Sequence, residues 1–148
     1  MLKPTKILVP TDFSEYSNKA LSQAIDIARQ YNAKVFLIHV IEEHPIQTID
    51  EYSIGIEIVK ELEDKIFAIA KEKMQKQYAK FNQDKDIEIN TNIRVGVSYE
   101  EILKEEQDKN IDLIVIASLG KTGIAKYLLG SVARNVLKGA KCPVLLTK

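Results

Sequence analysis

The sequence has almost none of the residues that cross-link small secreted domains. Cys142 is the single cysteine among 148 residues. One cysteine forms neither an intramolecular disulfide nor a cysteine-based zinc site, which excludes the disulfide-rich and zinc-finger classes. We therefore expect a cytoplasmic protein that folds without cross-links. We also expect Cys142 to be a buried packing residue, because no base accompanies it as a nucleophile would require.

An excess of charge and long apolar runs are also absent. The 21 Lys and Arg residues balance 21 Asp and Glu residues, so the formal net charge is +0. Proteins dedicated to nucleic acids carry an excess of basic residues, and we expect no nucleic-acid partner. No stretch approaches the ~18 apolar residues of a membrane span, and the first apolar run is too short for a signal peptide. We expect no membrane partner.

The remaining composition is that of an ordinary globular domain. Hydrophobic residues make up 45% and charged residues 28% of the chain, as in typical soluble domains. Single hydrophobic cores commonly serve about 100 to 200 residues. We therefore expect one domain that covers residues 1–148.

Apolar residues follow two kinds of spacing. Nearly continuous runs such as Lys34–Ile41 are typical of strands covered on both faces, whereas the three- and four-residue steps from Ala20 to Tyr31 indicate a helix. The stretch Ile87–Val95 alternates apolar and polar residues, which predicts a half-buried strand near an edge. The expected strands are 6–10, 34–41, 87–95, 112–117 and 143–147, and the expected helices are 20–31, 56–81, one that starts at residue 98, and 131–140.

Two segments carry local signals of their own. Ser98 and Glu101 have the spacing of a capping box, in which both side chains bond to amides at a helix start. We therefore expect Ser98 to cap the third helix. Residues 42–55 have neither spacing and contain His44-Pro45, which predicts a long connection at the rim of the sheet.

Strands and helices are thus expected to alternate along the whole chain. This order predicts right-handed crossovers and an α/β fold, a doubly wound five-stranded parallel sheet with helices on both faces. Ligands of such sheets lie at the carboxyl ends of the strands, where the strand order reverses. The loops after Pro10 and Ile116 should therefore lie side by side.

The loop after the fourth strand is the most informative part of the sequence. It reads Ala117-Ser-Leu-Gly-Lys-Thr-Gly123 and leads to Gly130-Ser131-Val132 at the start of the last helix. Glycines let phosphate oxygens approach backbone amides, and a helix N-terminus adds unpaired N–H groups and partial positive charge. The spacing alone leaves a plainer interpretation open, in which the glycines only make turns and let the helix pack closely.

Pro10-Thr11-Asp12 forms the other side of the expected crevice. An acidic residue such as Asp12 can hydrogen-bond a ribose or a base amino group there, or hold a metal-bound water near phosphates. Asp12 or Ser14 can equally cap the first helix. The local sequence leaves both interpretations open.

Other kinds of site are excluded by single positions. A P-loop that ends in Gly120-Lys121-Thr122 would need a glycine where Val115 stands. A phospho-accepting receiver domain would need an aspartate at the end of the third strand, where Arg94-Val95-Gly96 stands. We interpret His39 as a core histidine, and His44 lies in the long connection. No pattern indicates a catalytic group or a dedicated metal site.

Several segments share a pattern with one known family. They are Ile7-Leu-Val-Pro-Thr-Asp-Phe-Ser14, His39-Val40, Gly120, Gly130-Ser131 and Lys141-Cys-Pro-Val-Leu-Leu146. In these segments the chain resembles the nucleotide-binding branch of the universal stress protein family, over essentially its whole length. The family's ATP signature is Gly, two residues, Gly, nine residues, then Gly-Ser or Gly-Thr. Ala117 stands where that signature has its first glycine.

The resemblance implies a Rossmann-like stress-response protein that binds ATP, ADP or AMP, with Mg²⁺ carried by the phosphates. It implies that the adenine is framed near the first two strand ends, the ribose is met by residues 116–119, and the phosphates lie at the glycines and the last helix. At most it implies weak ATP hydrolysis. The implied binding residues are Pro10, Thr11, Asp12, Val40, Ile116, Ala117, Leu119, Gly120, Gly130, Ser131 and Val132.

The last strand is the expected partner surface. Val144 and Leu146 share one face of the segment Pro143 to Thr147, and an unpaired sheet edge at the end of the chain invites a second strand. The resemblance implies the same homodimer, together with a client protein that the sequence does not name. The alternative is a universal-stress-type dimer that binds no nucleotide and acts through partner contacts alone.

Overall fold

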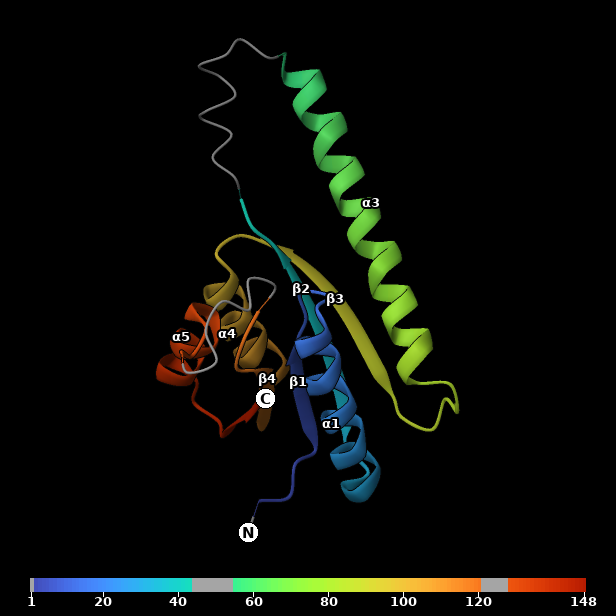
Figure 1. Cartoon of the computed structure of the whole chain (residues 1–148), viewed down its shortest axis with the longest axis vertical. Coiled ribbons are helices and arrows are strands. Elements are labelled where there is room, and N and C mark those ends of the chain that lie inside the picture. Colours follow the sequence, from blue (N-terminus) through green and yellow to red (C-terminus); the bar gives the residue numbers. More distant parts are fainter. Residues whose placement is uncertain (1, 44–54, 121–127) are drawn as a thin grey trace.

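The computed structural model describes residues 2–43, 55–120 and 128–148, and strands and helices alternate through them (Figure 1). Every strand and helix expected from the sequence is present, with small shifts at their ends, as in the third strand, which begins at Ile89. The elements are β1 (Lys6–Pro10), α1 (Glu15–Tyr31), β2 (Lys34–Ile41), α3 (Ile56–Phe81), β3 (Ile89–Val95), α4 (Ser98–Lys109), β4 (Leu113–Ala117), α5 (Ser131–Gly139) and β5 (Val144–Thr147).

The five strands form one sheet in the order β3-β2-β1-β4-β5, and every neighbouring pair is parallel. The doubly wound fold predicted from the sequence is confirmed. The central strand β1 pairs with β2 on one side and β4 on the other, so that Ile7 lies between Val35 and Leu113. The strand order reverses between β1 and β4, which is where this kind of sheet holds ligands.

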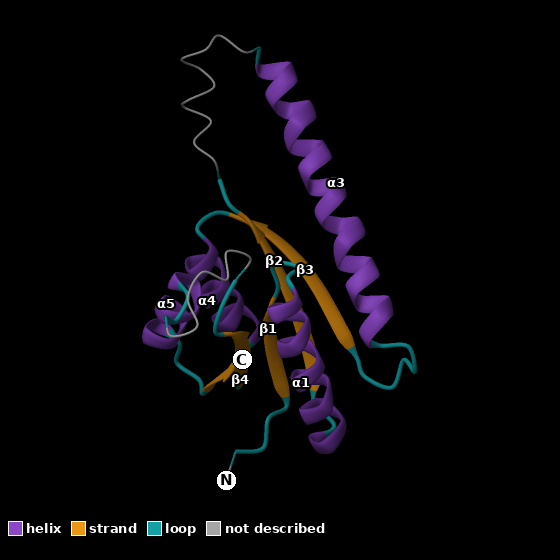
Figure 2. Ribbon diagram, viewed as in Figure 1, coloured by secondary structure: helices purple, strands orange, loops and turns teal. Residues whose placement is uncertain are grey.

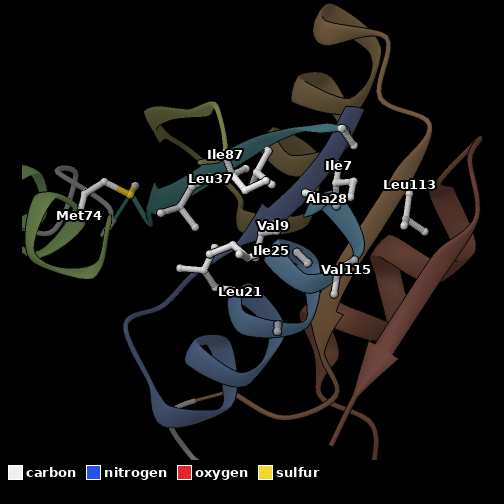
Figure 3. Packing of buried hydrophobic residues seen from close by; sticks show 14 residues of the cluster. Ile7, Val9, Leu21, Ile25, Ala28, Leu37, Met74, Ile87, Leu113 and Val115 are labelled. Atoms are coloured by element: carbon white, nitrogen blue, oxygen red, sulfur yellow. The ribbon is translucent and has the colours of Figure 1, made fainter. Parts of the chain in front are cut away.

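Helices cover both faces of the sheet (Figure 2). On one face α1 and α3 pack against Ile7 and Val9 of β1, and Figure 3 shows this cluster with Leu21 and Met74. On the other face α4 and α5 pack against Leu8. Successive residues of a strand point to opposite faces, and β1 is apolar on both because both faces are covered.

The expected capping box at the start of α4 is wrong. Ser98 is the first residue of the helix rather than its N-cap, and its Oγ donates to Oε1 of Glu42 at 2.8 Å. Glu101 forms ion pairs with Lys104 and Arg94 instead. These cations, Lys104 first, hold the pKa of Glu101 below its ordinary value. A carboxylate held by two cations is not available to an amide of the helix start.

Helix α3 packs on the sheet with only part of its length. Its buried residues are Ala70, Met74 and Gln77, all in the second half, and the first half projects past the ends of the strands (Figure 1). The helical apolar spacing that predicts a helix over 56–81 therefore begins well before the part of the helix that is buried. Neither α3, with its 26 residues, nor any other helix in the described ranges is apolar enough over enough length to cross a membrane.

Cys142 precedes β5 and is half-buried rather than fully buried, so that part of the sequence prediction is wrong. It packs against the cluster between α4, α5 and the sheet. The buried Glu106 accepts the backbone N–H of Cys142 at 2.8 Å and that of Lys141 at 2.7 Å. Burial, helped by the Glu106 carboxylate, raises the pKa of the Cys142 thiol to about 12.

Cys142 should therefore react slowly with iodoacetamide while the protein is folded. The thiolate is the nucleophile, and raising the pKa from 9.0 to about 12 lowers the thiolate fraction at pH 8 by about a thousandfold. Mass spectrometry after timed alkylation, with and without urea, measures the difference. Glu106→Gln should speed the reaction of the folded protein, since it removes a negative charge. Equal rates in the folded and unfolded protein would contradict the expectation.

Candidate functional site

The loop after β1 is built by short side chains that bond to the backbone. Ser14 is the N-cap of α1, and its Oγ accepts the N–H of Ser17. Asp12 does not cap the helix; its Oδ1 accepts the N–H of Ser14 at 3.0 Å. The two roles left open by the sequence are thus divided, since Ser14 begins the helix and Asp12 shapes the turn before it.

Buried hydrogen bonds hold this loop against α3 and β2. Thr11 is 5% exposed, and its Oγ1 lies 3.0 Å from Oε1 of Gln77 on α3. The Gln77 amide nitrogen donates to Oδ1 of Asn18 at 2.7 Å. Nδ1 of His39 lies 2.8 Å from the carbonyl oxygen of Thr11, so His39, which is half-buried, supports the loop backbone.

Phe13 adopts an unusual backbone conformation in the same loop. Its φ is 65°, a left-handed value that bulky residues rarely take. Its N–H donates to Thr11 Oγ1 at 3.0 Å. The centroid of its ring lies 4.3 Å from the centroid of the His39 ring and 5.8 Å from Nζ of Lys73. These contacts with β2 and α3 offset the local strain and fix the entrance to α1.

Gly130 joins the loop after β4 to the start of α5. Its N–H donates to the carbonyl oxygen of Ser118 at 2.8 Å, and a Cβ built on Gly130 would lie 3.2 Å from that oxygen. A side chain at this position would force the two segments apart. The Gly130 amide is therefore occupied, and the amides available to an anion are those of the first turn of α5, which no helical bond uses.

The loops after β1 and β4 meet as the sequence predicted. A Cβ built on Gly120 would lie 3.1 Å from Oδ2 of Asp12, so the carboxylate lies directly against the glycine backbone. This contact is close because Gly120 has no side chain. The acidic turn of one loop and the glycine of the other thus lie side by side at the point where strand order reverses.

A cavity of about 620 Å³ opens at this place. Its walls come from the ends of β1, β2 and β4, the start of α5, and the faces of α3 and α4 that look toward the sheet edge. All the binding residues implied by the sequence line it: Pro10, Thr11, Asp12, Val40, Ile116, Ala117, Leu119, Gly120, Gly130, Ser131 and Val132.

Two walls of this cavity were not predicted. Helix α3 contributes Ile66, Ile69 and Lys73, and α4 contributes Ser98 and Ile102. Both helices follow the carboxyl ends of strands, so the order of the elements placed their starts at this edge, but the sequence did not show which of their side chains face the cavity. Gln77 of α3 hydrogen-bonds Thr11 but is not among the residues that line the cavity, so it gave no sign of this wall either.

Ala117 takes part in both the core and the cavity. Its side chain packs against the cluster between α1 and the sheet, and the residue also lines the cavity. Strand β4 alternates its faces, so Ala117 shares the α1 side with Val115, while Ile116 belongs to the α4 and α5 side. The methyl group thus has packing partners of its own.

Some of the residues singled out from the sequence lie outside the described ranges. These are Lys121, Thr122 and Gly123 of the loop after β4, and His44 of the long connection. Within the described residues, no group of three His, Cys, Asp or Glu side chains could hold a metal ion.

The cavity combines three chemical environments. Apolar side chains such as Val40 and Ile116 suit a flat aromatic ring, and Asp12 is an acceptor for hydroxyl or amino groups. The start of α5, with Ser131 as its first residue, offers N–H groups and partial positive charge to an anion. The arrangement suits a ligand that is aromatic at one end and phosphorylated at the other.

Comparison with known proteins gives one consistent result. The model of the universal stress protein family matches residues 4–148. Universal stress protein MJ0531 of Methanocaldococcus jannaschii is 37% identical over 146 residues, which cover 97% of this chain and 81% of the relative. Universal stress protein MJ0577 of the same organism is 37% identical, with 97% and 94% of the two chains covered.

Solved structures agree with this result. That of MJ0577 aligns with a TM-score of 0.83 and 36% identity over 99% of this chain and 97% of the other. A universal stress protein in complex with cAMP aligns with a TM-score of 0.66 and 24% identity, over 99% and 98% of the chains. One from Archaeoglobus fulgidus in complex with dAMP gives 0.66 and 21%, over 99% and 100%. The likeness to the last two concerns the fold alone.

Proposed function

The chain belongs to the universal stress protein family, and from that premise we propose that its cavity binds an adenine nucleotide: ATP, ADP or AMP. Nucleotide occupancy then regulates contact with a client protein in the cytoplasm, so that the protein acts as a sensor or regulator in a stress response. Two members of the same fold family hold cAMP and dAMP, which supports the class of ligand.

The observation that supports the proposal most directly is that two glycines, Gly120 and Gly130, lie next to the start of α5. A Cβ on Gly120 would lie 3.1 Å from Asp12, and one on Gly130 would lie 3.2 Å from Ser118. Both glycines keep the backbone accessible next to the start of α5, where Ser131 and Val132 offer N–H groups that no helical bond uses. Phosphate oxygens bind at such helix starts.

The other end of the cavity suits adenosine. Pro10, Val40 and Ile116 line the cavity and supply apolar surface for the base. Residues 117–119 also line the cavity, and the ribose is proposed to contact them. Any Mg²⁺ would arrive with the phosphates, since that ion keeps several waters and few protein ligands. The carboxylate that lies against Gly120, and so next to the proposed phosphate site, is that of Asp12.

Calorimetric titration of nucleotide-stripped protein tests the proposal. ATP, ADP, AMP and inorganic phosphate are titrated separately, with and without Mg²⁺. We expect binding of the adenine nucleotides and weaker binding of phosphate alone, since phosphate lacks the contacts of the base. If no adenine nucleotide binds, the alternative gains support: a dimeric member of the family that works through partner contacts without a nucleotide.

We also propose that β5 pairs with β5 of a second copy. In the described residues β5 is an edge strand with β4 as its neighbour. Ile114 N–H donates to Pro143 O, and Ser118 N–H donates to Thr147 O, so the odd-numbered residues of β5 bond to β4. The amides of Val144 and Leu146 therefore face the open edge.

Val144→Pro should halve the mass of the assembly in light scattering. The substitution removes an N–H that faces the open edge, while proline is tolerated at such edge positions and the bonds to β4 remain. Val144→Thr is the matched control, because it keeps the amide and nearly the same side-chain shape, and its mass should equal that of the parent. An unchanged mass for Val144→Pro would mean that β5 does not carry the association.

A further inference from the structure

A buried amide joins α3 to the loop after β1. Gln77 shares one side of α3 with Ala70 and Met74, and these three are the buried residues of the helix. Oε1 of Gln77 accepts the hydroxyl hydrogen of Thr11 at 3.0 Å, and Nε2 of Gln77 donates to Oδ1 of Asn18 at 2.7 Å. We call these two hydrogen bonds the Gln77 bridge.

The Gln77 bridge is not needed to fill space in the core. An apolar side chain of similar length would occupy the same position beside Met74, whereas a buried amide is costly unless its polar atoms are bonded. Oε1 and Nε2 of Gln77 are both bonded, one to the loop after β1 and the other to the first turn of α1. Buried networks of this kind fix one arrangement of the elements that they join.

Thr11 connects the Gln77 bridge to the proposed nucleotide site. A hydroxyl has one hydrogen, and donating it to Gln77 leaves the lone pairs of Thr11 Oγ1 to accept the N–H of Phe13 at 3.0 Å. That bond helps to hold Phe13 at its left-handed φ of 65°. Asp12 lies between these two residues in the chain, and its carboxylate lies against the backbone of Gly120. The bridge therefore helps to set the position of the Asp12 carboxylate.

We propose that Gln77 is a positioning residue for the nucleotide site and couples occupancy of the cavity to α3, an inference that rests on the function proposed above. Gln77 does not line the cavity, so it acts through Thr11, which does. Coupling between two sites is reciprocal. If the bridge holds the loop in its binding arrangement, a nucleotide that fixes the loop also fixes the second half of α3.

Gln77→Met tests the bridge, because methionine has nearly the same length and bonds to neither Thr11 nor Asn18. The Thr11 hydroxyl keeps one acceptor, Oγ of Ser17 at 3.1 Å, and Asn18 is partly exposed to water, so the variant should fold. We expect its Kd for ATP in calorimetric titration to rise about tenfold, as it would if the binding arrangement of the loop fell to about a tenth of the population.

Asn82→Leu is the matched control. Asn82 is a second buried amide, 2% exposed against 7% for Gln77, and it is the C-cap of the same helix. Its Nδ2 donates to the carbonyl oxygen of Ile87 at 2.9 Å, before the start of β3 and so at the opposite edge of the sheet from the cavity. This variant should melt at a lower temperature and keep the parent Kd. If Kd rises with the loss of stability in both variants, the role of Gln77 is structural only.

The double variant with Thr11→Val shows whether Gln77 acts through Thr11. Valine has the shape of threonine without the hydroxyl, so Thr11→Val already breaks the bond from the loop to Gln77. Adding Gln77→Met should then leave Kd at the value of Thr11→Val. Losses of affinity that multiply would mean that Gln77 affects binding by another route, which would overturn the proposal.

Hydrogen exchange measured amide by amide tests the positioning without a ligand. In the nucleotide-free protein, Gln77→Met should speed exchange of the Phe13 N–H about tenfold, because the acceptor of that N–H opens more often. Asn82→Leu should leave this rate unchanged. An unchanged rate in Gln77→Met overturns the role of Gln77 whether or not the protein binds a nucleotide.

Exchange in α3 tests the coupling in the other direction. The amides of residues 77–81 lie beyond Lys73, the last residue of α3 that lines the cavity. With ATP at the same multiple of each Kd, so that stabilisation by mass action is equal, ATP should slow their exchange more in the parent than in Gln77→Met. Equal slowing would mean that the coupling does not run through Gln77. If the parent binds no adenine nucleotide the proposed function fails, whereas a parent that binds ATP and a Gln77→Met variant with the same Kd overturn the role of Gln77 alone.

Discussion

Gly130→Val should lower the affinity for ATP by at least about a hundredfold. A Cβ at Gly130 would already lie 3.2 Å from the carbonyl oxygen of Ser118, so a branched side chain forces α5 away from the loop after β4. Hydrogen bonds to a charged group contribute about 1.5 to 3 kcal/mol each. Losing two of them at the start of α5 weakens binding by about two orders of magnitude or more.

The chain provides a closely matched control in Gly55. Gly55 is the N-cap of α3 with φ −58° and ψ 142°, and Gly130 is the N-cap of α5 with φ −56° and ψ 149°. A Cβ on Gly55 meets nothing within 4 Å. Gly55→Val therefore makes the same change at the same kind of helix start, and ATP affinity should stay at the parent value.

Calorimetry and thermal melts on both variants separate binding from folding. Gly130→Ala extends the series, since one methyl group requires a smaller shift and should weaken binding less than valine does. If Gly130→Val binds ATP as tightly as the parent, the phosphates do not lie at the start of α5. The proposed site would then be wrong even though the cavity is present.

The strands and the site loops could be predicted because their signals are local. The run Lys6–Pro10 is apolar on both faces because helices cover both faces, and Asp12 and Gly120 follow strands whose ends must meet once the sheet is parallel. The meeting of these loops therefore followed from the order of the elements. Each such prediction needed only the spacing of residues that are neighbours in the sequence.

The predictions that failed depended on side-chain contacts that the local spacing does not show. The capping box at Ser98 has the right local spacing. In the structure, however, the Ser98 hydroxyl donates to Glu42, and Glu101 forms ion pairs with Arg94 and Lys104. Packing of α3 could not be predicted either, because its apolar spacing continues beyond the sheet that it would cover. Spacing predicts which side of a helix is apolar, and contacts decide whether that side is buried.

Arg94→Met should lower the free energy of unfolding by about 3 to 5 kcal/mol, the cost of removing one partner from a buried ion pair. The Arg94 guanidinium bonds to Glu105 at 2.6 Å and to Asp108 at 2.6 Å and lies 3.4 Å from Glu101. The Glu105 side chain is 1% exposed, and besides Arg94 it accepts a hydrogen bond from the side-chain amide of Asn92 at 3.0 Å. An amide does not balance the charge of a buried carboxylate.

Arg29→Met is the matched control for this prediction. Arg29 also lies within 4 Å of three carboxylates, those of Asp26, Asp84 and Asp86, but its side chain is 40% exposed and theirs are 40% or more exposed. Exposed ion pairs contribute about 0 to 1 kcal/mol. Urea denaturation of the two variants therefore compares the removal of an arginine from a buried and from an exposed ion-pair cluster. Similar decreases in the free energy of unfolding would mean that burial does not determine the contribution of the arginine.

The double variant Arg94→Met with Glu105→Met identifies the cause of the loss. If the cost comes from an uncompensated buried carboxylate, removing that carboxylate as well should bring the free energy of unfolding back to within about 1 kcal/mol of the parent, because apolar replacements of buried ion pairs are often neutral or stabilising. If the double variant stays as unstable as Arg94→Met, the stabilising contribution of Arg94 is the packing of its long side chain between β3 and α4. In that case charge compensation at Glu105 is not what holds these two elements together.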